Sequence, residues 1–396
     1  MMAGDPIVIA GMARTPMGSF QGCLSSVSGP ELGSVAIKAA LERAQVPTED
    51  VSEVIMGCVL AAGQGQAPAR QAALGAGVPT NVGATTINKM CGSGMKATMF
   101  GHDLIIAGSA DIAVTGGLES MSNAPYLLPK ARRGLRMGHG EIKDHMFIDG
   151  LEDAYDKGQL MGVFAENTAE KYQFTRESQD EFAIRSLQRG KKANEDGSFD
   201  AEMASVPVES RKDQVVVDRD EQPFSANLQK IPTLKPAFRK NGTVTPANSS
   251  SISDGASALV LMRQSEAETR GITPLATIVA HATHSQAPEW FTTAPVGAIT
   301  KLFEKTGWSK KDIDLFEVNE AFAVVTMAAI REHSLGSEQV NVHGGACAMG
   351  HPVGSSGSRI ICTLIGAMHK YDVKKGVAAL CIGGGEATAV AIERAN

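Results

Sequence analysis

One sequence pattern occurs twice in this chain of 396 residues, and it limits the possible folds more than any other feature. Residues 50–57 read Asp-Val-x-x-Val-x-Met-Gly, and residues 312–319 read Asp-Ile-x-x-Phe-x-Val-Asn, 262 positions later (312 − 50). Residues 116–119 (Gly-Gly-Leu-Glu) have a counterpart at 383–386 (Gly-Gly-Gly-Glu), 267 positions later (386 − 119). We therefore expect two halves with one topology, as a gene duplication would produce. The alternative is a chance similarity between generic βα units.

Local patterns indicate which elements the two halves contain. A Cys-Gly-Ser-Gly turn at 91–94 and a Gly-Ser-Ser-Gly-Ser turn at 354–358 each open a helix rich in small residues. Apolar residues at helical spacing follow Pro30 over 31–44. Short apolar runs, which are typical of buried strands, lie at 6–13, 51–60 and 112–117. Strands that alternate with helices predict an α/β fold with a largely parallel, buried sheet.

The middle of the chain differs from both halves. It holds most of the charge runs and few long apolar runs, and residues 166–188 have the pattern of an exposed amphipathic helix or helix pair. We interpret it as an insertion draped over one face. This divides the chain into a first half (1–121 plus 252–274), an inserted loop domain (122–251) and a second half (275–396). A basic cluster in the insertion is either a solvated face, a site for a phosphate-bearing ligand or a subunit contact: Lys130, Arg132, Arg133, Arg136 and Lys143.

Composition excludes several classes of protein. The chain has 37 Lys and Arg against 43 Asp and Glu, and this net charge of −6 argues against a nucleic-acid surface and against attraction to anionic membranes. It has no apolar run of membrane-spanning length, and its N-terminus does not have the pattern of a signal peptide. Six cysteines without a C-x-x-C pair predict free thiols in a cytoplasmic setting.

Cys91 lies in the segment Asn-Lys-Met-Cys-Gly-Ser-Gly, where a strand ends and a helix begins. The free N–H groups and partial positive charge of a helix N-terminus lower a thiol pKa and favour the nucleophilic thiolate. The neighbouring glycines allow a sharp turn and the close approach of a ligand. The alternative is a buried, inert cysteine.

A second unusual segment, residues 341–352, places His343, Cys347 and His351 among glycines. Zinc binding by these three side chains is one alternative, because they recur at four-residue spacing. That spacing aligns ligands only on a helix, which the glycines disfavour, and no fourth ligand is evident. We therefore predict no metal site here.

Two further segments put polar residues at the ends of apolar runs. Cys381 ends a buried run and precedes three glycines, and Asn319 begins an Asn-Glu-Ala-Phe segment. Ligand sites in open α/β sheets gather outside the carboxyl ends of strands, so these side chains are candidates for one shared site.

Together, four blocks in this order resemble the thiolases, which cleave or form 3-oxoacyl-CoA. The blocks are Asn-x-x-Cys-Gly-Ser-Gly (88–94), Asn-Glu-Ala-Phe (319–322), Gly-His-Pro (350–352) and Cys-x-Gly-Gly-Gly (381–385), and the similarity extends over essentially the whole chain. The resemblance implies a duplicated five-layer αβαβα fold with a loop domain inserted after the first half.

The resemblance also implies roles for individual residues. Cys91 would be acylated, His351 would activate it, and Cys381 would move the proton on the other substrate. Asn319 would hold a water in one oxyanion hole beside His351, and the N–H groups of Cys91 and Gly383 would form the second. A thioester is both a good acyl carrier and a good leaving group, so ping-pong kinetics are expected. No bound cofactor is implied, and coenzyme A (CoA) is a substrate.

Ligand contacts follow from weaker matches. Ser250 lies in a loop similar to the one under the pantetheine in the family, and the pocket wall would comprise Leu160, Met161, Phe238 and Phe322. The alternative is that these are ordinary core residues. The chain departs from the family at Leu160, where some members have histidine, at Pro223-Phe224, where several have arginine, and at 291–295, where Phe-Thr-Thr-Ala-Pro replaces Met-Gly-x-Gly-Pro. These departures bear on acyl-chain length and on CoA contacts.

We therefore expect a cytoplasmic thiolase of fatty acid metabolism acting on acetoacetyl-CoA or another short- or medium-chain 3-oxoacyl-CoA. One alternative is a decarboxylating enzyme of the ketoacyl-synthase type, which needs no second cysteine. Another is an inactive acyl-CoA-binding scaffold. The expected partners are acyl-CoA and CoA, without nucleic acid or membrane. Residues 126–140 resemble the loop that forms tetramers in the family, which predicts a homotetramer with the basic cluster near the CoA 3′-phosphate.

Overall fold

The computed structural model describes residues 4–209 and 213–395. Residues 1–3 and 396, which the predicted first and second halves include, and residues 210–212 of the predicted insertion lie outside the described residues. The strands of the first half are β1 (Ile7–Arg14), β2 (Gly18–Ser19), β3 (Glu53–Gly57), β4 (Gly83–Ile87), β5 (Ile112–Ser120) and β10 (Ser253–Arg263). Those of the second half are β11 (Ala276–Ser285), β12 (Leu315–Val318), β13 (Lys375–Ile382) and β14 (Glu386–Arg394).

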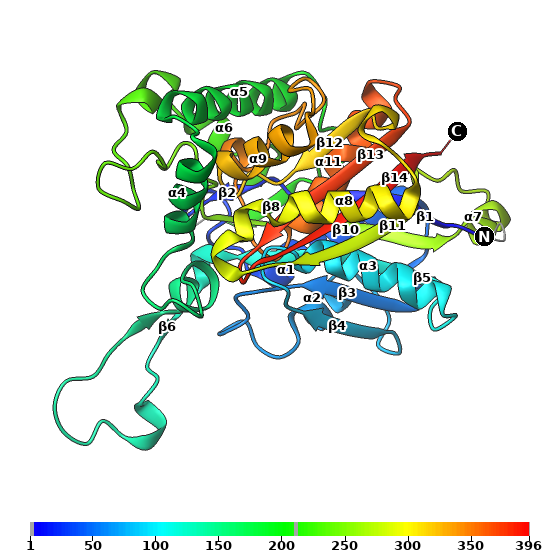
Figure 1. The fold of residues 1–396 in the computed structure, drawn as a ribbon. Helices are drawn as coiled ribbons and strands as arrows, with labels where there is room; N and C mark the ends of the chain where they lie inside the picture. The colour runs from blue at the N-terminus through cyan, green and yellow to red at the C-terminus, as the bar shows by residue number, and fades with distance from the viewer. Residues whose placement is uncertain (1–3, 210–212, 396) are drawn as a thin grey trace.

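The two halves have the same strand order. It is β4-β3-β5-β10-β1 in the first half and β12-β13-β14-β11 in the second, where a single bridge from Val340 to β12 occupies the position of β4. Strands β1 and β11 pair briefly at Val8–Thr277 and Ile9–Ala276, which joins the halves edge to edge (Figure 1). The predicted duplication is therefore confirmed, but the pairing of 116–119 with 383–386 is not structural, because 383–385 form the turn after β13 and Glu386 begins β14.

The prediction of a largely parallel sheet is wrong, because the sheet is mixed. Strands β3, β4 and β5 are parallel, as are β12 and β13, whereas β10 and β14 run antiparallel to both of their neighbours. Only three residues separate β13 from β14. So short a connection can form a hairpin but cannot form the longer crossover that parallel strands need.

Helices form three layers around these strands. In the first half they are α1 (Gly29–Ala44), α2 (Pro68–Gly75), α3 (Ser93–Ile106) and α7 (Gln264–Arg270). In the second half they are α8 (Ala294–Thr306), α9 (Ala323–His333), α10 (Ala346–Met349) and α11 (Ser356–Lys370). One apolar core lies between α1, α2 and the first-half strands, another surrounds α3 and α11 in the middle, and a third lies between α8 and the second-half strands (Figure 1). The layers thus run helix, strand, helix, strand, helix, as predicted.

Small residues let the two central helices begin side by side. A Cβ at Gly94 of α3 would lie 2.5 Å from Ser358 Oγ of α11, and a Cβ at Gly117 of β5 would lie 1.9 Å from the carbonyl oxygen of Gly354. Only glycine permits such close approach. The turns that precede α3 and α11 therefore meet at one end of the central layer.

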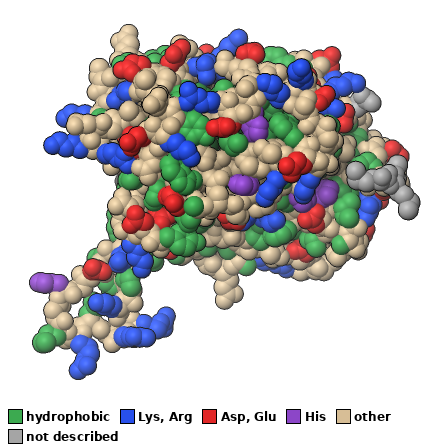
Figure 2. Space-filling model, in the orientation of Figure 1, with side chains coloured by type: hydrophobic (Ala, Val, Ile, Leu, Met, Phe, Trp, Pro, Cys, Tyr) green, Lys and Arg blue, Asp and Glu red, His purple; other side chains and the backbone are tan. Residues whose placement is uncertain are grey.

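The segment between β5 and β10 contains the helix pair that the sequence predicts. Its helices are α4 (Met161–Tyr172), α5 (Arg176–Glu195) and α6 (Gln222–Ser225), and its strands are β6 (Tyr126–Leu127), β7 (Lys143–Asp144), β8 (Val206–Glu209) and β9 (Gln214–Val217). The chain between β6 and β7 projects from the body as an arm, at the lower left of Figures 1 and 2. The basic cluster gathers on this arm, and all five of its side chains are exposed.

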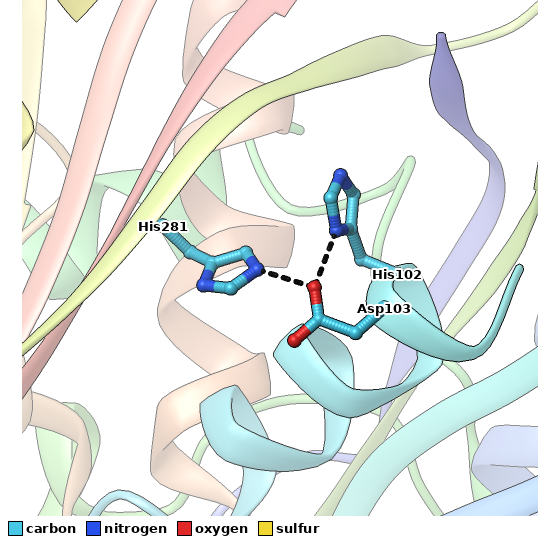
Figure 3. Close-up of side chains that lie close together, drawn as sticks. All are labelled: His102, Asp103 and His281. Atoms are coloured by element: carbon cyan, nitrogen blue, oxygen red, sulfur yellow. Dashed lines mark hydrogen bonds and ion pairs between the residues drawn. The ribbon is translucent and has the colours of Figure 1, made fainter. Parts of the chain in front are cut away.

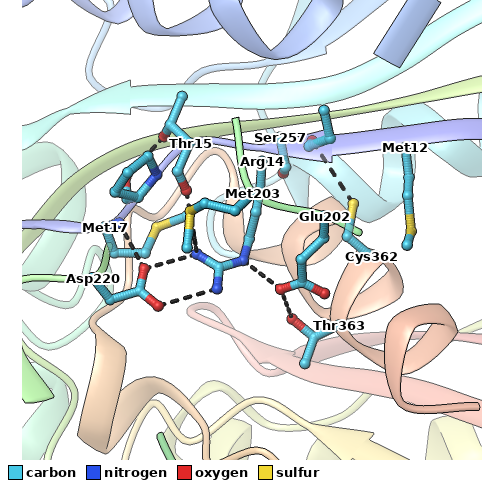
Figure 4. A network of polar contacts seen from close by, with 12 residues as sticks. Met12, Arg14, Thr15, Met17, Glu202, Met203, Asp220, Ser257, Cys362 and Thr363 are labelled. Carbon is cyan, nitrogen blue, oxygen red and sulfur yellow. Dashed lines mark hydrogen bonds and ion pairs between the residues drawn. The ribbon is translucent and has the colours of Figure 1, made fainter. Parts of the chain in front are cut away.

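A buried ionic network fastens this segment to the two central layers (Figure 4). Arg14, at the end of β1, is completely buried. Its guanidinium donates to Glu202 at 2.5 Å and, through two nitrogens, to Asp220 at 2.7 and 3.0 Å. Glu202 also accepts a hydrogen bond from Thr363 of α11 at 3.0 Å. Two carboxylates on one buried cation compensate the cost of removing it from water.

Candidate active site

A cavity of about 370 Å³ opens where the turns before α3 and α11 meet. Its wall is largely apolar, and it is formed by both halves together with residues 147–162 and 237–252. Eight of the ten predicted site residues line it: Cys91, Leu160, Met161, Phe238, Ser250, Phe322, His351 and Gly383. An apolar pocket with a few polar groups in its wall is the usual form of a small-molecule site.

Cys91 lies two residues before α3, and its side chain is partly exposed in the cavity wall. The preceding residue, Met90, has a φ of 47°, so the backbone makes a left-handed turn that non-glycine residues rarely adopt. Burial raises the pKa of the Cys91 thiol to about 11, although the N–H groups of Gly383 and of Cys91 itself lower it. The pKa shift is opposite in direction to the predicted lowering, because desolvation outweighs the hydrogen bonds from these two N–H groups.

His351 faces the same cavity, and its neighbours determine which nitrogen carries the proton. Ser356 Oγ lies 2.5 Å from His351 Nδ1 and donates its own hydrogen to the carbonyl oxygen of Pro352 at 3.1 Å. We assign the proton to Nδ1, which then donates to the serine oxygen. Nε2 therefore has a free lone pair, and this nitrogen is buried without a hydrogen-bond partner among the described residues. Burial lowers the pKa of His351 to about 3, so the ring is neutral.

Cys381 does not line the cavity but lies behind its wall. It is fully buried near the end of β13, in an apolar cluster that includes Met161, Phe238 and Phe322. Burial raises the pKa of this thiol, and the nearby Cys91 raises it further. The sulfur atoms contributed by the two halves are therefore close enough to interact electrostatically.

Asn319 also lies outside the cavity wall, one residue beyond β12. Its Oδ1 accepts a hydrogen bond from Arg359 of α11 at 3.5 Å. This contact directs the amide nitrogen away from the arginine, and Nδ2 is buried without a partner among the described residues. A buried amide N–H with no acceptor is available to a water or a ligand oxygen.

Three residues that shape the site are missing from the sequence-based prediction. Ser356 fixes the histidine tautomer, and Arg359 orients Asn319. Glu119 is completely buried at the end of β5, and burial raises its pKa to about 7. The sequence repeat pairs Glu119 with Glu386 and so marks the position, but it does not reveal what Glu119 contacts.

Glu119 ties the loops around the cavity together. It accepts hydrogen bonds from the N–H groups of Val59 at 2.9 Å, Leu60 at 3.0 Å and Gly354 at 2.9 Å. The first two belong to the loop after β3, and the third belongs to the turn before α11. One carboxylate thereby holds a loop of the first half against the turn that carries His351.

The zinc alternative at residues 343–351 is not supported by the side-chain positions. His343 packs against the rings of Phe199 and Tyr371, with centroids 5.6 Å away in both cases. The Cys347 thiol donates to the carbonyl oxygen of Glu320 at 3.6 Å. His351 points into the cavity instead, so these three side chains do not converge.

The ligand side of the cavity is aromatic. Phe238 and Phe322 meet edge to face with centroids 6.0 Å apart, and the start of α4 places Leu160 and Met161 beside them. At the segment where the sequence departs from the family pattern, Phe291 is buried in the cavity wall, whereas the Trp290 ring carries Lys171 Nζ 4.2 Å above it. The departure thus adds an aromatic side chain to the wall.

Comparisons with known proteins match nearly the whole chain to one family, the thiolases. The family model of the thiolase N-terminal domain matches residues 7–265, and that of the thiolase C-terminal domain matches residues 272–394. An acetyl-CoA acetyltransferase of Cupriavidus necator is 49% identical over 98% of this chain and 99% of its own length. One of Schizosaccharomyces pombe is 48% identical over 99% of this chain and 100% of its own length.

Solved structures give the same result. The Acat5 thiolase from Ascaris suum in complex with coenzyme A is 40% identical, with a TM-score of 0.93 over 98% of this chain and 100% of that chain. The acetyl-CoA acetyltransferase of Bacillus anthracis is also 40% identical, with a TM-score of 0.96 over 98% of this chain and 99% of that chain.

Proposed function

Because the chain belongs to the thiolase family, it is an acyl-CoA C-acyltransferase, and we propose that it interconverts short- or medium-chain 3-oxoacyl-CoA and acetyl-CoA through an acyl group on Cys91. One observation carries the proposal: the Cys91 thiol and the free lone pair of His351 Nε2 share one cavity. Coenzyme A is the second substrate, as supported by the CoA complex of the Ascaris suum thiolase.

In the cleavage direction, the Cys91 sulfur attacks the 3-oxo carbon while its proton passes to His351 Nε2. The bond between carbons 2 and 3 then breaks, and its electron pair remains on carbon 2 of the departing acetyl-CoA. The Cys381 thiol donates the proton that this carbon needs. Charge that develops on the carbonyl oxygens is stabilised by the N–H groups of Cys91 and Gly383 and by a water held on Asn319 Nδ2.

The second half-reaction restores both sulfurs. Coenzyme A gives its thiol proton to the Cys381 thiolate and attacks the acyl carbon on Cys91. The Cys91 sulfur departs and recovers its proton from His351. The sum is one 3-oxoacyl-CoA and one CoA converted into an acyl-CoA and an acetyl-CoA, with no proton left over.

The resting site is uncharged, and this sets the timing of proton transfer. Burial keeps Cys91 as a thiol and His351 as a neutral ring. A free thiolate–imidazolium pair is therefore disfavoured before substrate binds. Transfer to Nε2 accompanies attack, because the negative charge then moves from sulfur to a carbonyl oxygen that has waiting donors.

A thiolysis assay with CoA and a series of 3-oxoacyl-CoA chain lengths tests this function. We expect the highest kcat/KM for acetoacetyl-CoA or another short- or medium-chain 3-oxoacyl-CoA. The decarboxylating alternative is tested in parallel with a malonyl thioester. Carbon dioxide release from the malonyl thioester without any thiolysis would overturn the proposal. If the protein shows neither activity, an acyl-CoA-binding scaffold would be favoured.

We further propose a homotetramer in which the arm between β6 and β7 contacts a second dimer. The arm projects from the body and carries the basic cluster. It also carries four exposed apolar side chains: Tyr126, Leu135, Met137 and Ile142. Light scattering of the whole chain and of the double variant Met137→Asp/Ile142→Asp measures its contribution. A tetramer is expected for the first and a dimer for the second, whereas a monomer in either case would refute the assembly.

A cytoplasmic location stays a prediction, supported by six cysteines that are all free thiols. A role in fatty acid metabolism also stays a prediction. None of the helices in the described ranges combines the length and apolar character needed to cross a membrane. The division into a first half (1–121 plus 252–274), an insertion (122–251) and a second half (275–396) also stays a prediction.

A further inference from the structure

A second group of polar side chains lies away from the cavity, where α3 meets β11 (Figure 3). His102 and Asp103 belong to the C-terminal part of α3, and His281 belongs to β11. His102 is nine residues beyond the start of α3, so about 14 Å of helix separates it from the turn that follows Cys91. Nothing in the proposed reaction uses these three residues.

The ligand atoms of this group lie close together, with both histidine nitrogens directed at Asp103 Oδ1. Asp103 Oδ1 lies 3.0 Å from His102 Nδ1 and 2.9 Å from His281 Nε2, and all three atoms lie within 4.8 Å of one another. Tetrahedral zinc sites have bonds of about 2.0–2.1 Å, which places neighbouring ligand atoms roughly 3.3 Å apart. The two distances from Asp103 Oδ1 are slightly shorter than this, so an ion that binds here replaces both hydrogen bonds, and each imidazole then carries its hydrogen on the other ring nitrogen.

The two histidine rings pack against each other and are mostly buried. Their centroids lie 5.1 Å apart at an interplanar angle of 87°, and their side chains are only 18% and 17% exposed. Asp103 is 54% exposed, so the open side of the group faces water. Such a site offers three protein ligands and leaves the remaining position to a water molecule, as in open zinc sites.

The group combines one carboxyl group with two imidazole rings, so it offers one oxygen and two nitrogen atoms as ligands. Lys96 and Lys305 lie near the group and oppose a cation, and Lys305 Nζ donates to the carbonyl oxygen of His281 at 2.8 Å.

We propose that His102 Nδ1, Asp103 Oδ1 and His281 Nε2 bind one Zn²⁺ ion, with water completing the coordination. Two imidazoles and one carboxylate are a donor set that zinc accepts. The ion would fasten a central helix of the first half to the first strand of the second half. The alternative is that the three side chains form only an ion pair between α3 and β11.

Isothermal titration calorimetry of the whole protein with ZnCl₂ tests the proposal. One ion per chain is expected, and His281→Gln should weaken its binding at least about tenfold. His369→Gln is the matched control, because it removes another surface histidine, whose ring donates a hydrogen bond to the backbone carbonyl of Leu275. Lys305→Met should change affinity in the opposite direction, tightening binding a few-fold by removing a nearby positive charge.

Cobalt substitution distinguishes this site from the cavity thiols. Co²⁺ bound by nitrogen and oxygen shows visible d–d bands without sulfur charge-transfer absorption. We expect that spectrum in the wild-type chain and its loss in both His281→Gln and His102→Gln. Thiolate charge-transfer bands, equal zinc affinity in the wild type and His281→Gln, or no zinc binding to the wild type would each overturn the proposal.

Discussion

The two halves of the chain share a strand order, yet they place different side chains at equivalent positions. The turn before α3 presents Cys91, whereas the equivalent turn before α11 presents small residues that follow His351. The strand β5 ends in a buried carboxylate, Glu119, whereas the equivalent β13 ends in Cys381 and the glycine turn. One scaffold thus produces two different sets of loops.

The two halves accordingly differ in how many of their side chains position loops and how many take part in the proposed reaction. In the first half, Glu119 binds three backbone N–H groups and keeps the loops in position. In the second half, Glu386, which the sequence repeat aligns with Glu119, begins β14 instead of ending the strand equivalent to β5. It is partly exposed and pairs at 2.6 Å with Lys89, two residues before Cys91. In the proposed reaction, the first half therefore contributes the acylated sulfur, and the second half contributes the base, the second sulfur and the amide donor.

Removing the one reactive group of the first half should have the largest effect. Cys91→Ala is expected to lower kcat for thiolysis by on the order of 10⁴ or more, because no acyl carrier remains. Cys23→Ala is the matched control, since Cys23 is a partly buried thiol outside the cavity. Substantial thiolysis by Cys91→Ala would show that the halves do not divide the chemistry in this way.

Among the second-half groups, Asn319 should have the next largest effect. Asn319→Ala removes the unpartnered amide donor and should lower kcat about 10²–10³-fold, with little change in KM, because the donor acts on the developing oxyanion. Steady-state kinetics with acetoacetyl-CoA measure both constants. A rise in KM at constant kcat would instead assign Asn319 to ground-state binding.

The two carboxylates that the sequence repeat aligns, Glu119 and Glu386, allow a direct test of the support role. Glu119→Gln should lower the free energy of unfolding by roughly 3 kcal/mol, because the new NH₂ group faces backbone donors in a buried site. Glu386→Gln should cost less than about 1 kcal/mol, since its ion pair is partly exposed. Thermal unfolding of both variants in one buffer measures the difference. Equal destabilisation would contradict the asymmetry between the halves.

A smaller effect is expected at His343, a second-half residue that takes no part in the proposed chemistry. Burial lowers its pKa to about 4, so the folded protein binds fewer protons than the unfolded chain between pH 6.5 and 4. This histidine therefore stabilises the fold fully above pH 6.5, and that contribution is lost as the pH falls towards 4.

His343→Phe should remove this pH dependence while preserving contact with the rings of Phe199 and Tyr371. Between pH 7 and pH 5 the wild type should lose about 2 kcal/mol more stability than the variant. Denaturant unfolding at the two pH values provides the measurement. An identical loss in both proteins would mean that His343 is not buried as a neutral ring.

The sequence predicts the local features of this molecule better than the long-range ones. Strand β1, helix α1 and the helix pair α4–α5 follow from periodicity, which neighbouring residues determine. The network of Arg14, Glu202 and Asp220 joins residues about 200 positions apart, and no local pattern marks it. The pKa of Cys91 was predicted in the wrong direction for a related reason, because burial depends on segments distant in sequence.

Each of the four sequence blocks places at least one residue in the cavity wall, since each block follows a strand or precedes a helix at one edge of the fold, but Asn319 and Cys381 lie outside that wall. The blocks do not reveal Ser356, Arg359 or Glu119, whose importance lies in the partners that they position. Roles for individual residues stay predictions until they are measured.

Isotope exchange in the variant Cys381→Ala tests the central claim, that each half contributes one sulfur with its own task. The variant and the wild type are incubated with acetyl-CoA in D₂O, and peptide mass spectrometry and NMR follow the acetyl group and its methyl protons. We predict an acetyl group on the Cys91 peptide of both proteins and deuterium in acetyl-CoA only with the wild type. Equal loss of acylation and exchange in the variant, or an acetyl group on another residue, would contradict the account.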